Sequence, residues 1–180
     1  MDITLTKYIN ALAGQSSFFD TLLRAITDYG VYAMILSVVG LWFVGSDKSR
    51  NRNACIATGL SFILGLLINQ VILLFLHRLR PYEIGLTQLF IAPNPDWSFP
   101  SDHSTAAAAI VIGIWLSGPR KLAAALAVVA VLVAFSRVYL GVHYVSDIAG
   151  GLFTAAIASA LVWKFYKPNN AVSQFLTRLF

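Results

Sequence analysis

Charged residues are scarce in this chain of 180 residues, where Asp, Glu, Lys and Arg together make up 12% and hydrophobic residues 58%. A soluble domain of this length needs more polar surface than these residues provide. The mean hydropathy is +0.73, and several apolar stretches are long enough to cross a membrane. The shortage of charge therefore excludes an ordinary soluble domain and predicts a single membrane-embedded domain over residues 1–180.

Cysteine and acidic charge are also in short supply. Cys55 is the only cysteine, which excludes an internal disulfide and a metal site built on cysteine pairs. Residues 1–4 lack the basic start of a signal peptide, so we expect the first span to act as its own insertion signal. The net charge of +5 could indicate nucleic-acid binding. Because most cations lie in short connections beside apolar runs, membrane orientation explains them better, and no nucleic-acid partner is expected.

The apolar runs predict an all-α fold, a polytopic membrane helical bundle with about five transmembrane helices and interfacial helices before them. The expected spans are residues 29–44, 54–76, 102–116, 122–140 and 146–163.

The remaining segments complete this division of the chain. Residues 1–27 hold two shorter amphipathic runs, which predict two interfacial helices, and residues 28–166 form the bundle. The connection 77–100 is rich in proline, so we expect it to be irregular, with one short helix near 84–91. Residues 167–180 are expected to form a cytoplasmic tail.

Basic residues favour one side of this layout. Five alternating spans place eight of the thirteen cations on one face: Lys48, Arg50, Arg52, Arg120, Lys121, Lys164, Lys167 and Arg178. The positive-inside rule assigns that face to the cytoplasm. The ends near 77–103 and 137–147 would then lie on the extracytoplasmic side of the plasma membrane.

All three histidines fall at those extracytoplasmic ends: His77, His103 and His143. In a helix His143 and Asp147 share a face, one turn apart, so the carboxylate could accept a hydrogen bond from one ring nitrogen and leave the other free as base or nucleophile. The alternative is a polar turn that merely caps two helices, and His77 has the same alternative of a structural role.

Several cations with few carboxylates at this end indicate that it binds an anion. Arg80 and Arg137 can fork onto phosphate oxygens, and Ser101 or Asp102 can start a helix whose N-terminus favours phosphate. His143 could then attack phosphorus while His103 protonates the leaving oxygen. A metal site is the competing interpretation, but neighbouring guanidiniums would repel a dication.

The motifs resemble a known family. Arg80-Pro81, then Pro-Ser-Asp-His-Ser at 100–104, then Ser-Arg, five residues, His, three residues and Asp at 136–147 resemble the three-part signature of the type 2 phosphatidic acid phosphatase family. The resemblance implies a metal-independent lipid phosphatase without a cofactor, working through a phosphohistidine. It makes His143 the nucleophile oriented by Asp147, His103 the acid, and Arg80, Arg137 and Ser101 the phosphate-binding residues.

Two positions depart from that signature. Leu73 stands where the family usually has Lys, so His77 or Arg78 could supply the missing hydrogen-bond donor to the phosphate. Asp102 stands where most members have Gly, and this form resembles the bacterial undecaprenyl-diphosphate phosphatases of the family.

The resemblance implies a lipid diphosphate substrate in the bilayer. Phosphatidylglycerol phosphate, phosphatidic acid or a lipid A phosphate are alternative substrates. A non-catalytic lipid-phosphate binder or transporter subunit is the alternative outside enzymes. Protein partners stay unassigned.

Overall fold

The computed structural model describes residues 1–45 and 47–168, and every regular element in these ranges is an α-helix. A short helix α1 precedes five longer ones, and their bounds are α1 Asp2–Asn10, α2 Ser17–Leu41, α3 Lys48–Leu73, α4 Asp102–Ser117, α5 Arg120–Tyr139 and α6 Val145–Phe165. The all-helical bundle predicted from the sequence is confirmed. Of the predicted cytoplasmic tail, residues 169–180 lie outside the described part of the chain.

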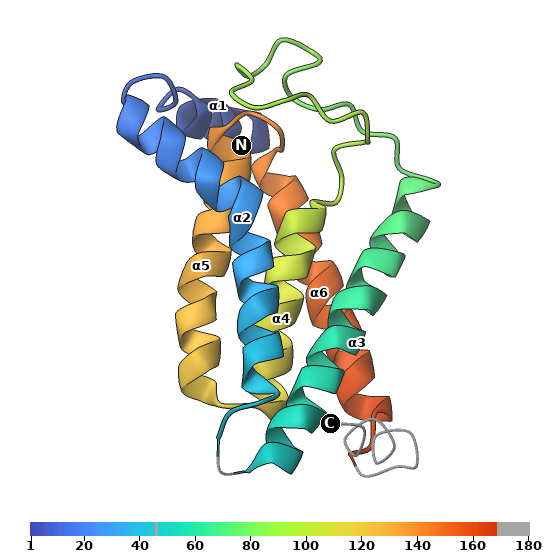
Figure 1. Ribbon diagram of the computed structural model, residues 1–180. Coiled ribbons are helices and arrows are strands. Elements are labelled where there is room, and N and C mark those ends of the chain that lie inside the picture. Colours follow the sequence, from blue (N-terminus) through green and yellow to red (C-terminus); the bar gives the residue numbers. More distant parts are fainter. Residues whose placement is uncertain (46, 169–180) are drawn as a thin grey trace.

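Helix α4 lies at the centre of the bundle and packs against α2, α3, α5 and α6, while α1 lies across one end (Figure 1). Four helices, α2, α3, α5 and α6, are long and apolar enough to cross a membrane. Helix α4 has only 16 residues but runs alongside them as the third of the five expected spans. Because consecutive long helices run in opposite directions, their connections alternate between the two ends of the bundle.

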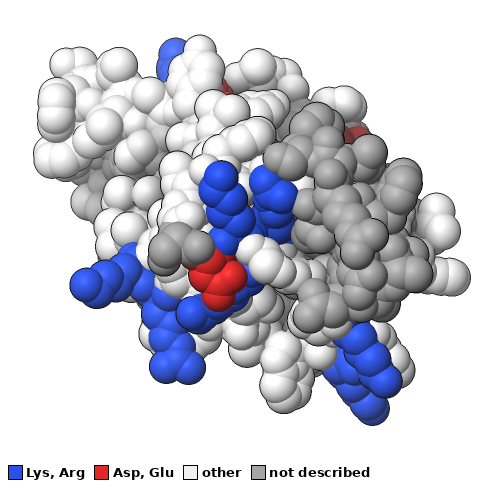
Figure 2. Space-filling model, turned by 60° about the horizontal axis from the view of Figure 1, so that its bottom comes forward, with Lys and Arg blue, Asp and Glu red and all other residues white. Residues whose placement is uncertain are grey.

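The basic connections lie together at the end opposite α1. Figure 2 looks onto this end and shows Lys and Arg side chains around a small acidic patch. The chain order puts Lys48, Arg50, Arg120, Lys121 and Lys164 at that end, as the alternation of spans predicts.

Helix α2 differs from the sequence prediction. The second interfacial helix and the first span are one continuous helix of 25 residues, without the expected break near Tyr29. The polar residue Thr27 lies inside this helix because its hydroxyl pairs with the hydroxyl of Ser136 on α5, 2.5 Å away. A polar residue that faces a polar partner does not interrupt a helix, so α2 continues through this position.

Residues 84–91 also differ from the prediction, since these described residues form turns rather than a short helix. Gly85 has a φ of +68°, which ends any right-handed helix there. Further on, the backbone N–H groups of Gln88 and Phe90 donate to Asn10 and Leu140 instead of to their own segment. The loop therefore obtains its hydrogen bonds from α1 and from the end of α5.

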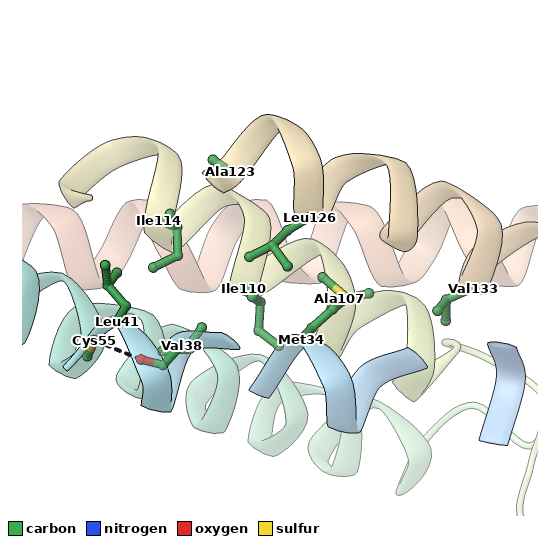
Figure 3. Packing of buried hydrophobic residues seen from close by; sticks show 10 residues of the cluster. All are labelled: Met34, Val38, Leu41, Cys55, Ala107, Ile110, Ile114, Ala123, Leu126 and Val133. Atoms are coloured by element: carbon green, nitrogen blue, oxygen red, sulfur yellow. Dashed lines mark hydrogen bonds between the residues drawn. The ribbon is translucent and has the colours of Figure 1, made fainter. Parts of the chain in front are cut away.

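The core joins α2, α4 and α5 through side chains such as Met34, Ile110 and Val133, as Figure 3 shows. Lipid tails are as apolar as these side chains, so close packing rather than the exclusion of water holds such helices together. Small residues permit that packing: a Cβ on Gly113 would lie 2.7 Å from the Thr58 hydroxyl, and one on Gly30 would lie 2.7 Å from Val133. Cys55 is buried in this cluster and donates to the carbonyl of Val38.

Candidate active site

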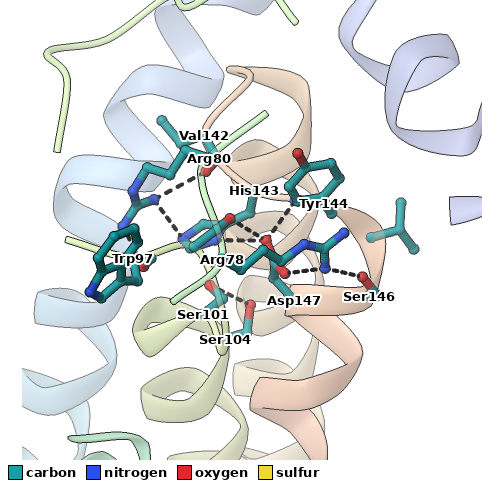
Figure 4. A network of polar contacts seen from close by, with 12 residues as sticks. Arg78, Arg80, Trp97, Ser101, Ser104, Val142, His143, Tyr144, Ser146 and Asp147 are labelled. Carbon is teal, nitrogen blue, oxygen red and sulfur yellow. Dashed lines mark hydrogen bonds and ion pairs between the residues drawn. The ribbon is translucent and has the colours of Figure 1, made fainter. Parts of the chain in front are cut away.

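Three chain segments meet at the α1 end of the bundle. They are the loop after α3, which carries Arg80, the start of α4 with Ser101, and the turn between α5 and α6, which carries His143 (Figure 4). The main-chain N–H of Ser101 donates to the carbonyl of Asp147, 3.1 Å away, which ties the start of α4 to α6. A Cβ on Gly151 would lie 2.7 Å from the Ser101 carbonyl, so glycine is needed for this approach.

The turn between α5 and α6 is fixed from both sides. Gly141 has a φ of +83°, and a Cβ there would lie 2.2 Å from the carbonyl oxygen of Gln88. Only glycine fits such a position without strain. The next residues, Val142, His143 and Tyr144, are all buried. The loop 74–101 therefore packs directly on the turn and holds the imidazole in place.

His143 and Asp147 form the predicted pair. The Nδ1 atom of His143 lies 3.3 Å from Oδ2 of Asp147, and both side chains are buried. The same Oδ2 accepts hydrogen bonds from the Ser98 hydroxyl at 2.5 Å and the main-chain N–H of Tyr144 at 2.8 Å. These contacts fix the carboxylate, which selects the tautomer with a proton on Nδ1 and leaves the lone pair on Nε2.

Arg80 closes the other side of the imidazole. Its Nη1 lies 3.3 Å from Nε2 of His143 and donates to the Val142 carbonyl at 3.0 Å. Its remaining donors reach the carbonyls of Asp96 and Trp97. Glu83 accepts a hydrogen bond from the main-chain N–H of Arg80. Arg80 is thus 2% exposed, held mostly by neutral carbonyls, and keeps its positive charge next to the nucleophilic nitrogen.

Arg137 is buried as well, but its side chain is not satisfied in the same way. It is 4% exposed, and its Nε has no hydrogen-bond partner in the described part of the chain. The positive charge is repelled by Arg80, acts on His103 and His143, and is attracted by the carboxylate of Asp28. A buried guanidinium that faces other cations is costly unless an anion completes the site.

The environment of His143 lowers its pKa to about 4. Burial makes the largest contribution, and repulsion from Arg137 and Arg80 acts in the same direction, whereas the hydrogen bond to Asp147 raises the pKa. The imidazole is therefore neutral at physiological pH, the state that a nucleophile requires.

His103 and Asp102 begin helix α4 and are half-buried. His103 lies near enough to His143, Arg80 and Arg137 to interact with their charges. Asp102 accepts a hydrogen bond of 2.6 Å from Asn69 of α3, which also donates to Thr105. Its carboxylate is therefore held beside α3.

The two residues expected to replace the missing lysine lie at the edge of this site. His77 is exposed and packs on Trp97, with ring centroids 4.9 Å apart. Arg78 directs its guanidinium to Asp147 and Asp2, at 2.8 and 2.9 Å. The role of either one in phosphate binding stays a prediction.

Three contributors were not recognised from the sequence: Ser98, Asn69 and Asp2. Asn69 precedes Leu73 by one helical turn, so helical spacing could have indicated it. Ser98 and Asp2 carry no such signal, because their contacts with Asp147 and Arg78 join segments far apart in the chain.

The site brings two imidazoles and two guanidiniums together, and the described residues around it form no metal site. Among residues 1–45 and 47–168, no group of three or more His, Cys, Asp or Glu side chains is placed to hold a metal ion. The predicted independence from metal stays a prediction.

Comparison with known proteins agrees with this arrangement. Residues 54–171 match the family model described as the PAP2 superfamily. The chain is 34% identical over 165 residues to undecaprenyl-diphosphatase BcrC of Bacillus subtilis, which covers 92% of this chain and 84% of that protein. It also resembles the crystal structure of a PAP2-type phosphatidylglycerolphosphate phosphatase of Bacillus subtilis, with a TM-score of 0.69 and 25% identity over 94% of this chain and 86% of the other. The LpxE structure of Aquifex aeolicus shares the fold, with a TM-score of 0.74 and 20% identity over 91% and 95% of the two chains.

Proposed function

Since the chain belongs to the PAP2 superfamily and is a membrane lipid phosphatase, we propose that it hydrolyses undecaprenyl diphosphate to undecaprenyl phosphate through a phosphohistidine at the outer leaflet. The buried Arg137, whose Nε has no hydrogen-bond partner among the described residues, next to a neutral His143, is the observation that carries the chemistry. The 34% identity to an undecaprenyl-diphosphatase, over 92% of the chain, supports the assignment of the substrate.

The first step transfers the terminal phosphoryl group to the enzyme. Nε2 of His143 attacks the terminal phosphorus, an N–P bond forms, and the bond from phosphorus to the bridging oxygen breaks. His103 donates a proton to this oxygen, and undecaprenyl phosphate leaves. Arg80 lies against Nε2 of His143 in the structure, so the substrate must draw this guanidinium onto its phosphoryl oxygens and thereby release the lone pair.

The second step returns the enzyme to its starting state. Water attacks the phosphohistidine while His103 accepts a proton from it, the N–P bond breaks, and inorganic phosphate leaves. Throughout both steps Arg80, Arg137 and the N–H groups in the first turn of α4, which follow Ser101, stabilise the charge on the equatorial oxygens. Asp147 keeps the imidazole oriented and stabilises the positive charge that develops on it.

A lipid panel tests the substrate. Release of phosphate from undecaprenyl diphosphate, phosphatidylglycerol phosphate, phosphatidic acid and a lipid A phosphate is measured in detergent, with and without EDTA. We expect the highest kcat/KM for undecaprenyl diphosphate and no effect of EDTA. A preference for another lipid would overturn the substrate, and loss of activity with EDTA would overturn the metal-independent phosphohistidine mechanism.

The outer-leaflet position follows from the basic connections at the opposite end, which the positive-inside rule assigns to the cytoplasm. Cysteine labelling in whole cells tests it, since Cys55 is buried and gives little background. A membrane-impermeant maleimide should label Ala92→Cys in intact cells but Lys121→Cys only after permeabilisation. The opposite result would place the site in the cytoplasm.

A further inference from the structure

Arg78 links two carboxylates, those of Asp2 and Asp147, which lie 145 positions apart in the chain. Its Nη1 donates to Oδ1 of Asp147 at 2.8 Å and to the Ser146 hydroxyl at 2.6 Å. Its Nη2 donates to Oδ2 of Asp2 at 2.9 Å. The guanidinium carbon lies 3.6 Å from the ring centroid of Tyr144, so the plane of the group is held as well. Both terminal nitrogens are therefore engaged on the Asp147 side of the imidazole.

The carboxylate of Asp147 depends on this contact. Its side chain is 0% exposed, and burying a carboxylate is costly unless it is paired and hydrogen-bonded. Oδ2 is occupied by Ser98, Tyr144 and His143. Among the described residues, Arg78 is the only Lys or Arg within ion-pair distance of this carboxylate, and it binds the other oxygen.

Helix α1 anchors Arg78 in turn. Asp2, Thr6 and Asn10 follow one another at intervals of four and thus share a helix face. Asp2 accepts from the N–H and the hydroxyl of Ser146, Thr6 accepts from the N–H of Val145, and Asn10 donates to the carbonyl of Tyr139. The polar face of α1 thus binds both sides of the turn that carries His143, while Ile3, Leu5 and Tyr8 are exposed.

We propose that Arg78 is a positioning residue for the phosphoryl transfer: anchored by Asp2 of α1, it holds the Asp147 carboxylate oriented toward His143. This inference rests on the proposed function. It gives Arg78 a role different from the phosphate binding expected from the sequence. To bind phosphate, the Arg78 side chain would have to leave two carboxylates, whereas as a positioning residue it keeps both contacts during the reaction.

The two roles separate in the kinetics of Arg78→Ala on undecaprenyl diphosphate. A positioning residue acts on the transition state, so kcat should fall roughly 10- to 100-fold, the factor of one hydrogen bond to a charged group, with KM changed less than about twofold. Arg78→Lys should recover part of kcat, and guanidinium ions at millimolar concentration should partly rescue Arg78→Ala. A rise in KM with unchanged kcat would overturn the proposal, as would a loss of kcat that neither lysine nor guanidinium restores.

Asp2→Asn provides a second arm that does not depend on the folding of Arg78→Ala. It removes the charge of the anchor and keeps its shape, so kcat should fall by a smaller factor, about two- to tenfold, with KM unchanged. Lys7→Ala, an exposed change on the same helix, is the matched control and should have no effect. An unchanged kcat in Asp2→Asn would overturn the anchoring by α1.

His143→Ala, measured in parallel, separates this inference from the proposed function. If His143→Ala is inactive and the Arg78 and Asp2 variants equal the wild type, only the positioning role is wrong. If His143→Ala retains turnover, the proposed mechanism is wrong, and the positioning role falls with it.

Discussion

The two ends of the bundle carry the same kinds of basic residue in opposite surroundings. At the α1 end, Arg80 and Arg137 are 2% and 4% exposed. At the other end, Arg50, Arg120 and Lys121 are exposed (Figure 2). The contrast is visible within the single helix α5, which begins with Arg120 at the surface and ends near the buried Arg137.

This difference teaches that burial, rather than residue type, separates a cation that acts in chemistry from one that sets orientation. An exposed arginine is solvated and costs nothing without a partner. A buried one is retained only where something binds it. At the α1 end Arg80 is bound by carbonyls and Arg78 by carboxylates, whereas the Nε of Arg137 has no partner among the described residues, as its proposed contact with the substrate requires.

The strongest test of the contrast removes the nucleophile. His143→Ala should lower turnover at least about 10³-fold, because no other group can form the phosphoenzyme. Acid-labile phosphoenzyme, trapped after mixing with labelled substrate, should form in the wild type and be missing in His143→Ala. Phosphoenzyme that persists in this variant would assign the nucleophile to another residue.

The two arginines of α5 give the next largest effect. Arg137→Ala should reduce kcat/KM roughly 10²- to 10³-fold, as expected when a donor to the transferring phosphoryl group is lost. Arg120→Ala, the matched control at the other end of the helix, should change kcat/KM less than about twofold. Equal effects of the two variants would contradict the contrast between the ends.

A pH profile sharpens the contrast further. Since burial lowers the pKa of His143 to about 4, its neutral form persists down to that pH, and its protonation should reduce kcat/KM only as the pH falls below about 5. Asp147→Asn removes a contact that raises this pKa, so the ratio of wild type to Asp147→Asn should stay nearly constant from pH 5 to 8, and ionisation of the substrate cancels in this ratio. A decline of this ratio beginning near pH 6.5, where an exposed histidine titrates, would show that His143 is not desolvated.

The smallest effect is expected at the basic end. Arg50→Gln combined with Lys121→Gln should leave kcat/KM in detergent within about twofold of the wild type. These side chains are exposed and lie at the end of the bundle opposite the site. A larger loss would mean that the two ends are coupled.

The sequence was sufficient for the bundle, the five-helix layout and the meeting of the three motifs, because apolar period and motif order are local signals. The pair of His143 and Asp147 followed from their spacing of four. The continuous α2 was not predicted, since Thr27 looks like a break unless its partner Ser136 is known. The link from Asp2 through Arg78 to Asp147 was out of reach for the same reason: charge and spacing say nothing about contacts between distant segments.

The shortness of α4 has a consequence for the substrate. Its 16 residues rise about 24 Å, less than the roughly 30 Å of hydrocarbon in a typical bilayer, and its first turn lies below the starts of α2 and α6 in Figure 1. A diphosphate head that reaches this turn must sink beneath the level of the surrounding headgroups, or the bilayer must become locally thinner around the protein. Turnover should therefore respond to the acyl-chain length of the host lipid, which makes membrane thickness a determinant of the rate.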